Sequence, residues 1–152
     1  MLLSEKTHIG VLGAGLMGHG IAQVFAIKGC DVAIYDRDEK MLSACPDRVR
    51  SNLDVFVRLG IVKKDEIAPA LKLIRLADSM ADMCRDRTFI IEAVSEILEI
   101  KRQVFSEMEK IVPPETILSS NAAVRAAGGS SNSGGAYRPA NASLSPMPIG
   151  TR

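Results

Sequence analysis

Three glycines near the start of the chain have the spacing of a site that binds a diphosphate. Gly13, Gly15 and Gly18 stand as Gly-x-Gly-x-x-Gly, after an apolar run at residues 8–12 and before a helical pattern. In such a loop the first glycine permits a tight turn, the second lets the backbone approach a pyrophosphate, and the third lets the helix pack on the strand. A helix that begins near Leu16 directs its unpaired N–H groups at the phosphates. The stretch therefore predicts a dinucleotide site.

An acidic residue stands where such a site needs a partner for the ribose. Asp36 follows a second strand-like run at residues 31–35 and lies 21 residues after Gly15. Its carboxylate can accept hydrogen bonds from the adenosine ribose hydroxyls, and it repels the additional phosphate of NADP. Arg37 could pair with that phosphate, but the acid favours NAD. The alternative for the loop and the acid is a structural turn followed by a helix-capping residue.

Strand-like and helical segments alternate over residues 1–121. Strands are expected at residues 8–12, 31–35, 74–77, 88–94 and 116–120. Helical patterns occupy residues 16–28, 39–59, 65–73, 80–84 and 97–112. The alternation predicts an α/β fold of the Rossmann type, a doubly wound parallel sheet in a single domain.

Local signals refine these segments. The apolar residues of the first helix are expected to lie toward one side of it, and these are Leu16, Ile21, Val24, Phe25 and Ile27. Gly29 ends that helix. Asp38 is expected to cap the second helix, which Pro46 kinks or splits near Cys45 because proline lacks the N–H that continues the helix. Asp78 is expected to cap the short helix at residues 80–84.

Composition excludes several classes of protein. The 152 residues are 47% hydrophobic and 24% charged, with a net charge of +1, so the chain has no bias toward nucleic acid. No apolar run approaches the roughly 20 residues of a membrane helix, and the start lacks a signal-peptide pattern. Cys30, Cys45 and Cys84 form no CxxC pair, which favours reduced thiols in a cytoplasmic protein and no metal site.

Residues 122–152 differ in character from the segment before them. Of these 31 residues, 22 are Ala, Gly, Ser, Pro or Asn. Such a segment buries too little apolar surface to offset its ordering entropy. We expect a dinucleotide-binding domain over residues 1–121 and a low-complexity, mostly disordered tail over residues 122–152. The abrupt change suggests a truncated or frame-shifted reading, and a natural flexible tail is the alternative.

Four stretches carry a resemblance to a known family: VLGAGLMGHGIAQVF at 11–25, IYDR at 34–37, FIIEAVSEILEIK at 89–101 and PPETILSSN at 113–121. They resemble the N-terminal NAD-binding domain of the 3-hydroxyacyl-CoA dehydrogenase family. The resemblance implies oxidation of 3-hydroxyacyl-CoA to 3-oxoacyl-CoA by hydride transfer to NAD, in fatty-acid metabolism and β-oxidation, with an acyl-CoA substrate.

The resemblance also implies roles for individual residues. By this resemblance, the pyrophosphate is bound by the six loop residues Gly13, Ala14, Gly15, Leu16, Met17 and Gly18. Asp36 corresponds to the acid that binds the adenosine ribose. Glu96 and Lys101 fall on the glutamate and lysine that the family places around the cofactor, and Asn121 on an asparagine beside the nicotinamide.

Each of these polar residues also has a structural alternative. Glu96 could favour a helix N-terminus electrostatically, and Lys101 could lie on a solvated helix face. Glu92, in an apolar strand, is expected to accept backbone N–H bonds at the strand end and is not assigned as a base. His8 and His19 are expected to lie at the surface.

The departures from the family concern catalysis. Ala123 stands where the family has a serine near the substrate, and no histidine follows His19 to act as the family's base. Asn52 and Leu59 stand where the family contacts coenzyme A through a serine and a lysine. We expect the family's helical second domain to be missing. No catalytic residue is therefore assigned, and we expect no useful turnover by the isolated chain.

Three hypotheses follow. The first is the NAD-binding domain of a 3-hydroxyacyl-CoA dehydrogenase, present as a fragment. The second is the cofactor domain of an L-gulonate-type sugar-acid dehydrogenase, which belongs to the same superfamily. The third is non-catalytic: a stand-alone nucleotide-binding module, or a remnant that needs a partner chain to complete a site. For a fragment, an apolar patch near the last strand is expected to be exposed, which would promote self-association or be covered by the missing helical domain.

Overall fold

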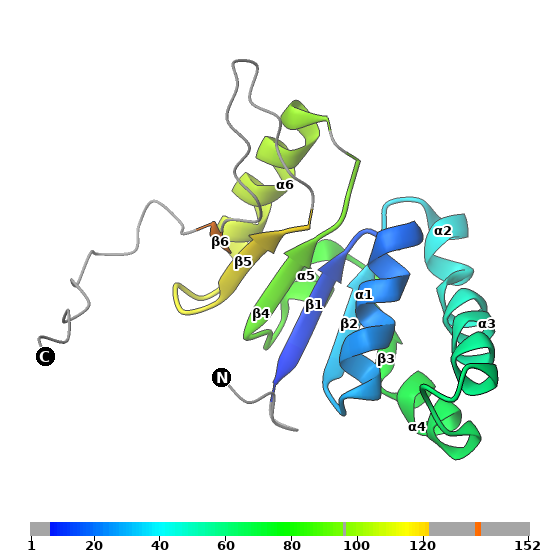
Figure 1. The fold of residues 1–152 in the computed structure, drawn as a ribbon. Coiled ribbons are helices and arrows are strands. Elements are labelled where there is room, and N and C mark those ends of the chain that lie inside the picture. Colours follow the sequence, from blue (N-terminus) through cyan, green and yellow to red (C-terminus); the bar gives the residue numbers. More distant parts are fainter. Residues whose placement is uncertain (1–6, 96, 122–135, 138–152) are drawn as a thin grey trace, which may run out of the picture.

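The computed structural model describes residues 7–95, 97–121 and 136–137. Its single sheet has the strand order β3-β2-β1-β4-β5-β6 (Figure 1). The strands are β1 (His8–Leu12), β2 (Asp31–Tyr35), β3 (Ile74–Leu76), β4 (Phe89–Glu92), β5 (Ile117–Ser120) and β6 (Ala136–Tyr137). The first five are parallel, and β6 pairs antiparallel with β5. The order of the five parallel strands is that of the Rossmann fold, which confirms the predicted α/β class.

Helices cover both faces of the sheet. They are α1 (Leu16–Ile27), α2 (Glu39–Ser43), α3 (Cys45–Arg58), η1 (Lys64–Glu66), α4 (Ile67–Lys72), α5 (Met80–Cys84) and α6 (Leu98–Ile111). One core joins the sheet to α1, α3 and α4, and a second core joins it to α5 and α6 (Figure 1). Side chains alternate between the cores along each strand: Ile91 faces the first and Ile90 the second. The buried strands therefore read as continuous apolar runs.

The strand register aligns the carboxyl ends of four strands. Leu12 pairs with Tyr35 on one side and with Glu92 on the other, and Glu92 pairs with Ser120. The residues that follow these strand ends therefore share one edge of the sheet. In open α/β sheets ligands bind at that edge, where the strand order reverses between β1 and β4.

Proline and polar caps set several helix boundaries. Pro46 lies in the first turn of α3, so the predicted long helix is split into α2 and α3 as expected. Asp38 caps α2, accepting hydrogen bonds from the N–H groups of Lys40 and Met41. The predicted capping of α5 by Asp78 is wrong: Ser79 is the N-cap, and its hydroxyl accepts from the Asp82 N–H.

The one-sided apolar pattern predicted for α1 holds in part, since Ile21, Phe25 and Ile27 are partly buried against the first core. Leu16 is 81% exposed and Val24 is 54% exposed. The helix instead buries small or polar residues against the sheet, namely Gly18, His19, Ala22, Gln23 and Ala26. A small-residue face lets the helix approach β1 closely, since the third glycine of the loop lies on it. Apolar periodicity therefore indicated the helix correctly, but only some of its apolar residues face the core.

The predicted tail at residues 122–152 lies outside the described residues except for Ala136 and Tyr137. These two residues form β6, an antiparallel strand that the sequence analysis did not predict. Among the described residues, no helix combines the length and the apolar character needed to cross a membrane.

Candidate functional site

A cleft of about 340 Å³ opens at the carboxyl ends of β1, β2 and β4. Its walls come from the glycine loop, the end of β2, the segment after β4 and one face of α6. The lining residues are Leu12, Gly13, Gly15, Asp36, Arg37, Ala93, Val94, Ser95, Ile100 and Val104. The sequence-predicted residues Gly13, Gly15 and Asp36 thus line one cavity.

The glycine loop has the geometry that its spacing predicts. Gly13 has φ of +104°, which L side chains rarely adopt, and a Cβ there would lie 2.6 Å from the Ala93 carbonyl oxygen. A Cβ on Gly18 would lie 1.8 Å from the Gly13 carbonyl oxygen. A Cβ on Gly15 would meet only the Met41 Cε, at 3.9 Å, so the loop is open on this side. Gly13 and Gly18 therefore allow close packing, and Gly15 leaves room for a ligand.

Helix α1 begins beside the cleft without a side-chain cap. Its N-cap is Gly15, which offers no capping oxygen, and its first turn holds no acidic residue. The first N–H groups of a helix need acceptors from outside the helix. Phosphate oxygens supply such acceptors and interact favourably with the positive end of the helix dipole. Leu16 and Met17, both exposed, belong to this turn.

Asp36 is fixed at the end of β2 by two backbone groups. Its Oδ2 accepts a hydrogen bond from the Ala14 N–H at 2.7 Å, and its Oδ1 accepts one from the Asp38 N–H at 2.9 Å. The first bond ties the acid directly to the glycine loop. A carboxylate held in this way has lone pairs left for ribose hydroxyls.

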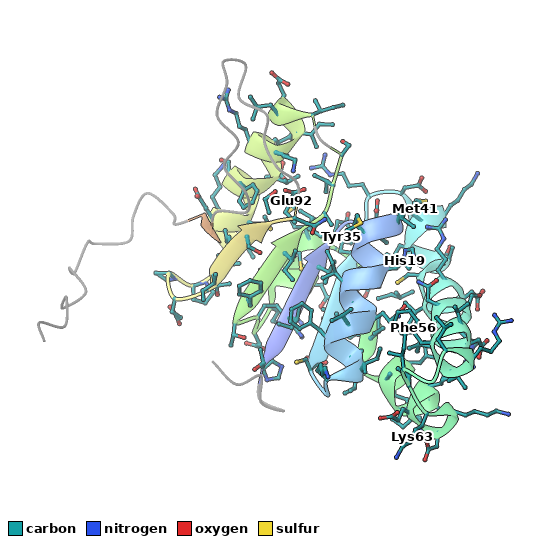
Figure 2. All side chains as sticks on the ribbon, in the orientation of Figure 1. His19, Tyr35, Met41, Phe56, Lys63 and Glu92 are labelled. Atoms are coloured by element: carbon teal, nitrogen blue, oxygen red, sulfur yellow. The ribbon has the colours of Figure 1, made fainter. Side chains whose placement is uncertain are left out.

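A buried ion pair lies behind the cleft. The Glu92 side chain is completely buried at the end of β4 (Figure 2), and Lys101 on α6 is 4% exposed. The Lys101 ammonium donates to Glu92 Oε2 at 3.0 Å and to the Ser120 hydroxyl at 3.1 Å. Ser120 in turn donates to Glu92 Oε2 at 2.6 Å, and the Val94 N–H donates to Oε1 at 2.7 Å. The network joins β4, β5 and α6.

This network corrects part of the sequence analysis. Lys101 does not lie on a solvated face, because its ammonium turns inward to Glu92. Glu92 accepts a backbone N–H as predicted, but its pairing with Lys101 and Ser120 was missed. Glu96 lies outside the described residues. Asn121 is exposed, and its N–H donates to the Glu92 carbonyl at the same sheet edge.

The two histidines have separate surroundings. His19 is 5% exposed, so the prediction of a surface residue is wrong for it. Its Nδ1 lies 2.6 Å from the Gly15 carbonyl oxygen, and it lines a second cavity of about 610 Å³ with residues of α1, α2 and α3, including Met41 (Figure 2). Asn52 also lines this second cavity, whereas Leu59 is exposed.

His8 belongs to a polar cluster at the amino end of β1, away from the cleft. Its Nδ1 lies 3.0 Å from Asp31 Oδ2, and Arg87 donates to the same oxygen at 2.6 Å. Partial burial opposes ionisation of Asp31, but the hydrogen bonds from His8 and Arg87 prevail and lower the pKa of this carboxyl. The cluster ties β2 to the segment before β4 and is structural.

The cleft therefore combines an anion-binding turn, a ribose acceptor and an apolar wall. The first two suit the diphosphate and the adenosine ribose of a dinucleotide. Leu12, Val94, Ile100 and Val104 supply the apolar surface that a base or a nicotinamide ring contacts. Among the described residues, no three His, Cys, Asp or Glu side chains are grouped to hold a metal ion. The residues present fit NAD.

Comparison with known proteins agrees with this geometry. Residues 8–126 match a family described as "3-hydroxyacyl-CoA dehydrogenase, NAD binding domain". A 3-hydroxybutyryl-CoA dehydrogenase of Mycobacterium tuberculosis is 36% identical over 114 residues, which are 74% of this chain and 40% of that protein. A peroxisomal fatty acid beta-oxidation multifunctional protein of Oryza sativa is 33% identical over 113 residues, 74% of this chain and 15% of that protein.

A solved structure shares the fold. The crystal structure of (S)-3-hydroxybutyryl-CoA dehydrogenase PaaH1 from Ralstonia eutropha superposes with a TM-score of 0.71 and 29% sequence identity. The superposition covers 76% of this chain and 41% of that one. The chain thus spans well under half the length of these relatives, and the match lies in the NAD-binding domain.

Proposed function

Because the chain belongs to the 3-hydroxyacyl-CoA dehydrogenase family through its NAD-binding domain, we propose that it supplies the cofactor half of a dehydrogenase for 3-hydroxyacyl-CoA thioesters. In that reaction the substrate's 3-hydroxyl loses a proton, and the carbon that bears this hydroxyl gives a hydride to NAD. Relatives with such names, and others named for fatty acid beta-oxidation, support this substrate class.

One observation carries the proposal. The Asp36 carboxylate accepts the Ala14 N–H of the glycine loop, so the ribose acceptor and the phosphate turn form one rigid unit beside the cleft. Pre-formed donors and acceptors lower the cost of binding because few groups need ordering. We assign the pyrophosphate to Gly13, Ala14, Gly15, Leu16, Met17 and Gly18. We assign the adenosine ribose to Asp36. Glu96 and Lys101 are proposed to lie around the cofactor, Lys101 from behind the cleft, where its ammonium is bound to Glu92 and Ser120.

The 152 residues are proposed to bind the cofactor without turning over substrate. Their two histidines are committed elsewhere, His8 to Asp31 and His19 to the Gly15 carbonyl oxygen. General acid–base catalysis contributes typically a factor of about 100 to 10,000. Because the described residues place no histidine in the cleft, we expect no useful turnover by the chain alone. A separately supplied helical domain that restored activity would identify the source of the base.

Calorimetric titration with NADH tests the proposal. We expect saturable binding that Asp36→Ala weakens about tenfold, because one charged acceptor of the ribose is lost. Asp54→Ala is the matched control, since Asp54 is an exposed aspartate on α3. Absence of saturable NADH binding by the folded wild-type chain would refute the proposal, as would equal effects of the two substitutions.

The domain division and the location are proposed on separate grounds. The last parallel strand ends at Ser120, which supports a folding unit over residues 1–121, and limited proteolysis should leave a fragment of that size. A cytoplasmic location is supported by three free, buried cysteines. Some relatives are named peroxisomal or glyoxysomal, so co-fractionation with an organelle is the outcome against it.

Self-association is proposed from exposed apolar residues. Ile111 and Ile117, which flank the turn before β5, are each about two-fifths exposed, and Leu16 and Met17 are more exposed still. Such surface favours association with a second copy or with a further domain. Sedimentation that gave a monomer at high concentration would count against it.

A further inference from the structure

We propose that Glu107 is a determinant of cofactor choice, because it forms an ion pair with Arg37, which could otherwise bind the 2′-phosphate of NADP. The inference rests on the proposed cofactor site and adds a residue on α6 that no sequence motif marks. It concerns the adenosine end of the cleft, where Asp36 and Arg37 follow β2.

Arg37 is placed to meet a phosphate on the ribose. It directly follows the ribose acceptor Asp36, and both residues line the cleft. An arginine at this end of a dinucleotide site is what accommodates the additional phosphate of NADP. The Arg37 side chain is 56% exposed, so its guanidinium is accessible to a ligand. Left unopposed, it would therefore reduce the selectivity that Asp36 provides.

Glu107 pairs with Arg37 from α6, the helix whose residues Ile100 and Val104 line the cleft. The Arg37 guanidinium donates to Glu107 Oε2 at 3.3 Å and to Oε1 at 3.5 Å. Glu107 lies one turn after the cleft residue Val104 on α6, 70 residues along the chain from Arg37. The pair therefore spans from the end of β2 to α6, beside the position of the adenosine ribose.

The Glu107 carboxylate is itself held in place. Gln103 lies one turn earlier on α6, and its side-chain amide donates to Glu107 Oε1 at 2.9 Å. A 2′-phosphate carries about two negative charges, so it would approach two fixed carboxylates, Asp36 and Glu107, around one arginine. To bind it, Arg37 must first leave Glu107. Both effects disfavour NADP and leave the uncharged 2′-hydroxyl of NAD unaffected.

The inference predicts a change in the ratio of two dissociation constants, that for NADPH over that for NADH. Glu107→Gln keeps the shape of the side chain but frees Arg37 and removes one repulsive charge. We expect the ratio to fall about fivefold, the size of effect that one exposed ion pair supplies at most. Asp36 remains in the variant, so NADH stays the preferred cofactor.

The experiment titrates the full chain with NADH and NADPH in low salt, for four proteins. These are the wild type, Glu107→Gln, the double variant Arg37→Met with Glu107→Gln, and the control Glu115→Gln. Glu115 is an exposed glutamate in the turn between α6 and β5, so its substitution makes the same change in net charge away from the cleft. Thermal unfolding establishes that each protein is folded.

The expected result is a lower ratio in Glu107→Gln alone, with the wild-type ratio in the control and no such fall in the double variant. An unchanged ratio in Glu107→Gln overturns the inference, and so does an equal fall in the double variant or in Glu115→Gln. Failure of the folded wild type to bind NADH overturns the proposed function and the inference together, which separates the two cases.

Discussion

Replacing Lys101 by methionine tests whether the network behind the cleft holds the fold together. Methionine fills a similar volume but removes the ammonium that lies 3.0 Å from Glu92 Oε2. The carboxylate then stays fully buried with two donors, the Val94 N–H and the Ser120 hydroxyl. The variant therefore leaves a charge uncompensated without opening a cavity.

The cost follows from burial. Removing one partner of a buried ion pair typically destabilises a protein by about 3 to 5 kcal/mol. Because two hydrogen bonds to Glu92 remain, we expect the lower end, about 3 kcal/mol. For a chain of this size that corresponds to a fall in melting temperature of about 6 to 12 °C. Total stability is of the order of 5 to 15 kcal/mol, so the variant should fold but melt early.

A double-mutant cycle with Glu92→Leu identifies the cause. The double variant removes both charges, so its loss should be smaller than the sum of the two single losses by at least about 1 kcal/mol. Lys110→Met is the matched control, since Lys110 is exposed in the last turn of the same helix, and should cost less than about 0.5 kcal/mol. Urea unfolding measures each value. Additive losses, or a loss in Lys101→Met no larger than in the control, would refute the reasoning.

Three further perturbations test other parts of the structure. Gly18→Ala should lower the free energy of unfolding by more than about 3 kcal/mol and abolish NADH binding, because the new Cβ would overlap the Gly13 carbonyl oxygen. The control Gly20→Ala, which adds its Cβ in open space on the same helix, should be neutral or stabilising, and equal melting temperatures of the two variants would contradict this. The pKa of Asp31 is lowered in the folded state, so its contribution to stability is present above about pH 4 and is lost as the pH falls through the folded value; Asp31→Asn should flatten this acid-side loss, and an unchanged pH profile would argue against the cluster. Burial raises the pKa of Cys45 and Cys84 to about 11, so alkylation of the folded chain at pH 8 should be about a hundredfold slower than of the unfolded chain, and rapid native labelling of either thiol would show that it is accessible.

Local signals predicted most of the strands and helices that position the site. The glycine spacing, the capping Asp38 and the helix split at Pro46 each depend on a few neighbouring residues, so the sequence is sufficient to locate them. The exposed side of α1 was not predictable in this way. Its buried face holds small residues because close approach to the sheet matters more there than apolar area.

Tertiary contacts were the harder part. Arg37 and Glu107 lie 70 positions apart in the sequence, at the end of β2 and on α6, and no local sequence pattern predicts that they pair. Surface ion pairs of this kind depend on how the end of β2 and α6 are placed by the whole sheet. The candidate cleft could be predicted from its glycine loop and Asp36, whereas the wall from α6 that completes it required the fold.

The buried lysine, by contrast, had a signal in the sequence that was overlooked. Lys101 shares one helical face with Val104 and Met108, at spacings of three and seven residues, and both of these are buried on α6. A lysine on a buried face requires an acidic partner, because an unpaired buried charge is too costly. Glu92 stands in an apolar strand just before that helix and has the same requirement. When opposite charges stand in two buried segments, one at the end of a strand and one on the helix that follows it, each needs a partner, so the two are expected to pair. This reasoning applies to other sheets of the same type.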